Sequence, residues 1–228
     1  MKKKTATLVR AAQCIAGALF VVIMARQPSA AAEIEGVRFT DHVRSGDVTM
    51  RLSCVGLLRY KVFIKAYVAA LYLGDGADRG DIFGDVPKRL ELSYFWKISG
   101  ADFGKAGDQI LARNVDAQTL AALRPRLDRI NALYRDIKPS DRYSLTYIPG
   151  VGTELALNGG RIGLIEGADF AAAYFRIWLG GDPIDARLRD QLLGCSGDSG
   201  GGHAAAPLGL LSDRSGTTRD QMRGRGDG

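Results

Sequence analysis

The pattern of hydrophobic and polar residues predicts two groups of β-strands separated by helices. In the first group, stretches rich in β-branched and aromatic residues predict strands at 37–40, 48–60, 61–73 and 90–96. In the second group, similar stretches predict strands at 142–148, 153–157 and 161–165. Pro149-Gly150 and Asn158-Gly159 supply the tight turns between the later strands.

Helical spacing of apolar residues predicts helices at 102–114, 116–134, 169–179 and 184–193. Asp116 and Asp169 are suitable N-caps, whereas Pro125 predicts a break or kink, so two shorter helices are an alternative there. Arg176 is the only charged residue from Phe170 to Trp178, which predicts a buried helix. Strands followed by helices and further strands indicate an α+β domain, in which an antiparallel sheet carries helices on one face.

The first 32 residues have the pattern of a secretory signal peptide. Three lysines at 2–4 precede an apolar run over 11–25, and small residues follow at 29–32. A run of this length is short of the roughly 20 residues that span a membrane, although an uncleaved anchor is the alternative. We therefore expect a periplasmic or secreted protein whose folded domain covers 33–195 and which has no stable membrane span after cleavage.

The net charge of +6 does not indicate a nucleic-acid partner. Five basic residues and no acidic residue lie in the first 32 positions, so the rest of the chain is nearly balanced. Residues 196–228 are rich in Gly, Ser, Asp and Arg, and such a segment buries too little apolar surface to fold. We predict a disordered tail there.

Two cysteines, Cys54 and Cys195, remain after the predicted cleavage. An oxidising compartment permits a disulfide between them, and two unpaired thiols are the alternative. The only histidines, His42 and His203, have no paired Cys or His spacing, so we predict neither a metal site nor a cofactor.

Three blocks of sequence resemble a known family. The first runs from Gly56-Leu57-Leu58-Arg59 through Lys65–Leu73, and the second is Tyr147–Thr153 followed by Leu157–Gly159. The third runs from Asp169-Phe170 through Ile177–Gly180 to Leu192–Gly194. In this order they are similar to the chalcone isomerase-like family, which includes exported bacterial members. The resemblance implies an open-faced β-sandwich with a ligand cleft between an antiparallel sheet and a layer of helices.

The same resemblance argues against chalcone cyclisation. The family's enzymes use an arginine, which Arg59 matches, but the strand threonine is replaced by Tyr67. The enzymes' other polar positions fall on Phe103, Ile110 and Gly160, whose side chains cannot hydrogen-bond. The chain therefore resembles a family member without chalcone isomerase activity.

The family's fatty-acid-binding branch fits better, because there an arginine and a tyrosine grip a carboxylate. This resemblance implies that Arg59 and Tyr67 bind the ligand. The alternative is that Arg59 pairs with an acid such as Glu91 and that Tyr67 is a core aromatic residue. The expected apolar walls of the cleft are Phe63, Tyr72, Phe103, Phe170 and Trp178.

Three functions are compatible with these features. The first is binding of a fatty acid or a similar small amphipathic carboxylate in the cleft. The second is an isomerase or intramolecular lyase acting on an unknown substrate through Arg59. The third is a protein-interaction module of the cell envelope, with the cleft filled by side chains.

Overall fold

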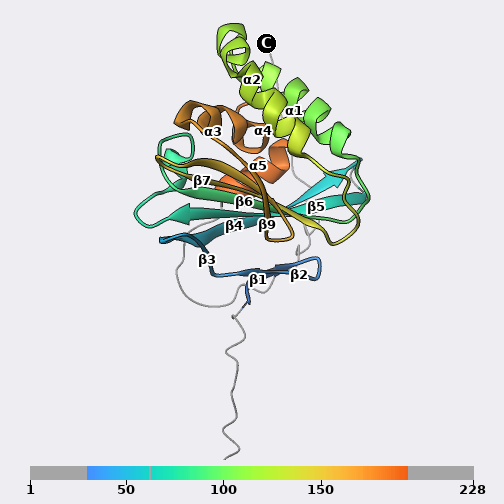
Figure 1. Cartoon of the computed structure of the whole chain (residues 1–228). Coiled ribbons are helices and arrows are strands. Elements are labelled where there is room, and N and C mark those ends of the chain that lie inside the picture. The colour runs from blue at the N-terminus through green and yellow to red at the C-terminus, as the bar shows by residue number, and fades with distance from the viewer. Residues whose placement is uncertain (1–29, 62, 195–228) are drawn as a thin grey trace, which may run out of the picture. The chain divides into compact units, whose positions relative to one another are not determined.

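A seven-stranded antiparallel sheet forms the centre of the computed structural model, which describes residues 30–61 and 63–194 (Figure 1). The strands follow one another in sequence order across the sheet. They are β3 (His42–Ser45), β4 (Val48–Tyr60), β5 (Ile64–Gly74), β6 (Lys88–Tyr94), β7 (Arg142–Ile148), β8 (Gly152–Leu157) and β9 (Gly160–Ile165). Strand β3 was not predicted, because the sequence favoured a turn from Arg44 onwards.

Helices cover one face of this sheet (Figure 1). They are α1 (Gly100–Asn114), α2 (Ala117–Leu133), α3 (Ala168–Tyr174), α4 (Arg176–Leu179) and α5 (Ala186–Gly194), with a short 3-10 helix η1 (Arg79–Asp81). Within the described residues, no helix has the length and apolar character needed to cross a membrane. The predicted α+β class and the open-faced arrangement are confirmed.

Two helical predictions were wrong in detail. Helix α2 continues through Pro125, which is exposed, rather than breaking there. The helix predicted over 169–179 is instead divided into α3 and α4. Asp169 is not its N-cap, since Gly167 takes that place with φ 106°, and the Asp169 carboxylate binds the Arg126 guanidinium.

Helix α5 lies directly on β4 because Gly56 has no side chain. A Cβ atom at Gly56 would lie 2.8 Å from the Leu188 side chain, closer than van der Waals contact permits. The backbone N–H of Leu57 also donates a 2.7 Å hydrogen bond to the side chain of Gln191. The glycine in the first family-like block thus brings the last helix onto the sheet.

A small hairpin packs on the other face of the sheet (Figure 1). Its strands are β1 (Ala30–Ile34) and β2 (Val37–Thr40), and Phe39 from β2 joins a second core with Met50 and Tyr72. Strand β1 was not predicted, because its first three residues were assigned to the end of the signal peptide. The rest of that predicted leader and the predicted tail at 196–228 lie outside the described residues.

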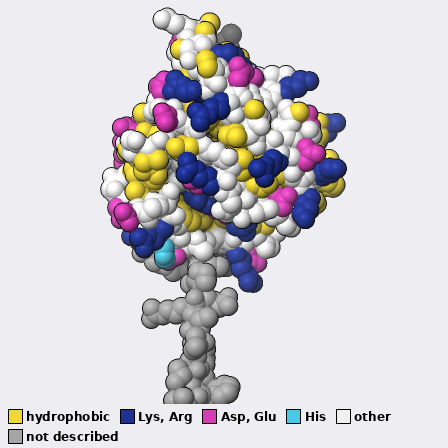
Figure 2. Space-filling view, in the orientation of Figure 1, with side chains coloured by type: hydrophobic (Ala, Val, Ile, Leu, Met, Phe, Trp, Pro, Cys, Tyr) yellow, Lys and Arg dark blue, Asp and Glu magenta, His cyan; other side chains and the backbone are white. Residues whose placement is uncertain are grey.

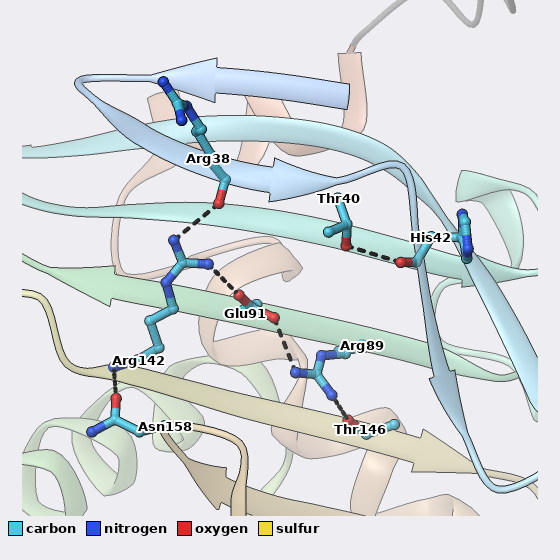
Figure 3. A network of polar contacts seen from close by, with 8 residues as sticks. All are labelled: Arg38, Thr40, His42, Arg89, Glu91, Arg142, Thr146 and Asn158. Carbon is cyan, nitrogen blue, oxygen red and sulfur yellow. Dashed lines mark hydrogen bonds and ion pairs between the residues drawn. The ribbon is translucent and has the colours of Figure 1, made fainter. Parts of the chain in front are cut away.

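A network of charged side chains fastens the hairpin to the sheet (Figure 3). The Glu91 carboxylate accepts hydrogen bonds from Arg89 at 3.0 Å and from Arg142 at 2.7 Å. Arg142 also donates to the backbone carbonyl of Arg38 at 2.9 Å, and its guanidinium lies 5.1 Å from the ring centre of Phe39. Glu91 is therefore the partner of these two arginines, and its suggested pairing with Arg59 was wrong.

Cys54, buried in β4, is disulfide-bonded. This excludes an unpaired thiol at that position. Cys195, the partner considered from the sequence, lies outside the described residues.

Candidate functional site

A cavity of about 220 Å³ lies between the sheet and the helices. Strands β5 and β6 form its floor, and helices α1 to α4 with the segment before α5 form its walls. Its lining is mainly apolar and aromatic and includes Tyr67, Tyr94, Phe103, Ile110, Ile177 and Trp178. A cavity of this composition at a sheet–helix junction is a candidate ligand site.

The alternation of side chains along β5 places Tyr67 in this cavity. Tyr67 and Leu71 point to the helices and belong to the main core, whereas Val68 and Tyr72 point to the hairpin side and belong to the second core. Strand β5 is buried on both faces from Tyr67 to its end, which explains its nearly continuous run of apolar residues.

The hydroxyl of Tyr67 has no hydrogen-bond partner among the residues that the structure describes. It is buried and meets no donor or acceptor with hydrogen-bonding geometry among the described residues. Burial raises the pKa of Tyr67. The nearby Trp178 offsets part of this rise, although it makes no hydrogen bond of good geometry with the Tyr67 hydroxyl. Because an unpaired buried hydroxyl costs about 1–3 kcal/mol, it needs an explanation. A ligand bound in the adjoining cavity would supply the missing hydrogen-bond partner.

Three further tyrosines line the cavity, and sequence reasoning missed all of them. The hydroxyls of Tyr134 and Tyr174 are 2.8 Å apart, and the ring of Tyr94 packs edge-on to Phe103 at 5.5 Å. Burial raises the pKa of each of these tyrosines. They are therefore neutral at physiological pH and act as hydrogen-bonding groups rather than charges.

Arg59 and Tyr67 do not come together, contrary to the expected carboxylate grip. In the β4–β5 register, Leu58 lies opposite Tyr67, and a bulge precedes the pairing of Arg59 with Lys65. Leu58 joins the main core, whereas the exposed Arg59 forms a 3.1 Å ion pair with Glu35 in the β1–β2 turn. Glu35 also binds Lys65. Arg59 is thus engaged on the hairpin side of the sheet, away from the cavity.

The structure places only part of the expected cleft wall around the cavity. Phe103 and Trp178 line it, and Phe170 is buried beside it, stacked on Tyr174 with ring centres 5.1 Å apart. Tyr72 does not line it, because it is an odd number of residues from Tyr67 and so points to the opposite face. Phe63 does not line it either, since it is 87% exposed beyond the end of β4.

The mouth of the cavity carries one acidic side chain. Asp102, in the first turn of α1, and Ile184, before α5, are exposed residues of the lining. Among the described residues, no lysine or arginine lines the cavity. Any charge that the lining presents to a ligand is therefore negative.

A second hollow, of about 340 Å³, is shallower and more polar. It lies among the ends of α1 to α4, where Asn114 bonds the backbone of Ile110 and Asp182, and Asp116 caps α2. Because these polar groups are already paired within the fold, this hollow is a weaker candidate despite its greater volume.

Among the described residues, no cluster of metal-ligating side chains competes with the cavity. Over 30–61 and 63–194, no three His, Cys, Asp or Glu side chains gather closely enough to hold a metal ion. On the face shown in Figure 2, basic side chains are dispersed among acidic and neutral ones.

Comparisons with known proteins agree with this architecture. The sequence model of a family described as chalcone isomerase-like matches residues 31–194. The fold is similar to the crystal structure of a fatty-acid binding protein of Arabidopsis thaliana, with a TM-score of 0.56 and 18% sequence identity. That similarity covers 72% of this chain and 96% of the plant chain. None of the curated proteins compared with this chain matches it in sequence.

Proposed function

Because this chain belongs to the chalcone isomerase-like family, we propose that it binds a small amphipathic, lipid-like ligand in the cavity between its sheet and helices. The observation that carries the proposal is the buried, unpartnered hydroxyl of Tyr67 beside an apolar cavity. The ligand's polar head bonds this hydroxyl, and its apolar part lies among the aromatic rings. The description of the plant neighbour as fatty-acid binding supports the same class of ligand.

The volume of the cavity limits the size of the ligand. At about 220 Å³ it exceeds the roughly 150 Å³ cavity that holds benzene and falls below the roughly 300 Å³ of the smallest drug-sized sites. A short alkyl chain fits inside. A longer chain extends through the mouth beside Ile184.

The lining favours binding over catalysis. A general base needs a pKa near the working pH. The buried tyrosines have raised pKa values, so they keep their protons and serve as hydrogen-bonding groups. The alternatives of an isomerase or an interaction module gain no comparable support from a specific contact.

A cavity-filling variant tests the proposal. Gly107 of α1 lines the cavity, and a Cβ atom there would make ordinary contact with Ile177 at 3.5 Å. In Gly107→Leu, the Cβ atom of the new side chain is therefore accommodated, and the atoms beyond it fill the cavity. Leucine also has a higher helix propensity than glycine, by somewhat less than about 1 kcal/mol, so we expect α1 to be retained. Ala112→Leu, at an exposed position of the same helix, is the matched control.

Native mass spectrometry of the purified full chain provides the measurement, before and after incubation with a mixture of octanol and octanoate. We expect a bound small molecule in the parent and in Ala112→Leu, and its loss in Gly107→Leu. If no molecule binds the parent, or if all three proteins bind it equally, the cavity is not a ligand site.

We also propose that the protein is exported. The support is the signal-like pattern of the first 32 residues, together with the disulfide at Cys54, since disulfides persist mainly in oxidising compartments. N-terminal sequencing of the protein recovered from a bacterial periplasmic fraction is expected to begin at or close to Glu33. An intact leader on protein confined to the cytoplasm would contradict export.

A further inference from the structure

We infer that the cavity selects amphiphiles whose head group is uncharged, such as an alcohol, and discriminates against carboxylates. This inference rests on the proposed function and narrows its ligand class. It departs from the carboxylate that the family resemblance suggests.

The charges around the cavity oppose an anionic head. No lysine or arginine of the described residues lines it, and Asp102 at the mouth is negative. The expected cation, Arg59, is paired with Glu35 on the other side of the sheet. An unpaired carboxylate is costly to bury, because it loses its hydration without gaining a counter-charge.

The inner polar groups also suit a neutral head. The polar side chains that line the cavity are Tyr67 and Tyr94 from the sheet, Asp102 from α1, Tyr134 directly after α2, Tyr174 from α3 and Trp178 from α4. Asp185, which caps α5 by accepting a 2.7 Å hydrogen bond from Leu188, adds a negative potential at the Tyr67 hydroxyl. A phenol can donate to and accept from an alcohol, so the two groups satisfy each other without a charge.

A carboxylic acid can enter such a site only as its protonated form. Because the solution pKa of a simple carboxylic acid lies between about 4 and 5, roughly one molecule in a thousand is protonated at about pH 7.5. The apparent affinity falls by about the same factor, because only the competent form binds. Octanol and octanoate share an alkyl chain and differ at the head group, so they isolate this effect.

Isothermal titration of the full chain with each ligand tests the inference. At about pH 7.5 we expect octanol to bind at least about 100-fold more tightly than octanoate. At about pH 5.5 we expect the affinity for octanoate to be about 100-fold higher, because the protonated fraction of octanoate rises about tenfold for each unit by which the pH falls. The affinity for octanol should not change. At about pH 7.5, Asp102→Asn should admit some of the anionic form as well and so raise octanoate affinity a few-fold, because the negative charge at the mouth is gone. Asp47→Asn, in the distant β3–β4 turn, should not change it.

Octanoate binding at neutral pH as tightly as octanol would overturn the inference while leaving the proposed function intact. If neither ligand binds, the proposed function itself fails, and the inference falls with it.

Discussion

At the scale of single residues, the hydrogen bonding of the Tyr67 hydroxyl differs from that of a tyrosine in the core. Its hydroxyl is buried and has no hydrogen-bond partner within 30–61 and 63–194. Tyr143, on the neighbouring part of the sheet, instead accepts a 2.8 Å hydrogen bond from the Arg135 N–H and donates a 3.0 Å bond to the Arg135 carbonyl. The two hydroxyls therefore differ in their contribution to folding.

We predict that Tyr67→Phe leaves the free energy of unfolding unchanged or raises it by about 1 kcal/mol, because no internal hydrogen bond is lost. It should weaken octanol binding about tenfold, the value of one hydrogen bond. Tyr143→Phe, the control, should lose about 1–2 kcal/mol of stability. Urea denaturation and calorimetry measure both effects. Equal destabilisation by the two variants would assign Tyr67 a structural role.

Lys88 is a charged residue in the core. It is 0% exposed, donates to the Gly84 carbonyl at 2.6 Å, and lies over the rings of Tyr147 at 4.9 Å and Phe175 at 5.7 Å. Burial lowers the pKa of Lys88 to about 8, an effect that Asp85 partly opposes. The charged form is thus held at a cost in stability.

The lowered pKa of Lys88 predicts that the stability of the fold depends on pH. Because the folded pKa of about 8 lies below the ordinary lysine value of 10.5, the unfolded state binds more protons between about pH 8 and pH 10.5, and stability rises with pH in that range. From about pH 7.5 to 9.5, the parent should gain about 2 kcal/mol relative to Lys88→Met. Chemical denaturation of both proteins across this range is the measurement. If the stabilities of the two proteins changed in parallel with pH, the pKa of Lys88 would not be lowered in the folded state.

At the scale of elements, most strands of the sheet were predictable from the sequence, whereas the face to which each side chain points was not. Stretches rich in β-branched and aromatic residues, bounded by turn residues, located β4, β5 and β7 to β9 closely, since these signals are local. The bulge between Leu58 and Arg59 changes which side chains share a face, and nothing local in the sequence announces it. Arg59 was therefore assigned to the wrong side.

The network on the hairpin side gives a prediction about the sheet. Glu91→Gln leaves Arg89 and Arg142 without their shared counter-charge, so we expect a loss of about 3 kcal/mol in the free energy of unfolding. Glu154→Gln removes only a longer pair with the exposed Arg161, at 3.5 Å, and should cost less than about 1 kcal/mol. Denaturant titration compares them. Similar small losses would mean that the network contributes little to holding the hairpin.

At the scale of the whole molecule, one sheet separates two environments. Its helix side carries an apolar cavity with neutral polar groups, and its hairpin side carries the clustered arginines with Glu91. The family resemblance predicted the fold and the general place of the cleft. It could not predict this separation, because Tyr94, Tyr134 and Tyr174 meet only through tertiary packing of distant segments.

The most direct test of the account is an isotope-filtered NOE experiment on the full chain with bound octanol. We predict contacts from the alkyl chain to Tyr67, Phe103 and Trp178, and their loss in Gly107→Leu. Contacts confined to the exposed aromatic residues Phe63 and Trp96, unchanged in Gly107→Leu, would show that octanol binds the surface and that the cavity is not the ligand site.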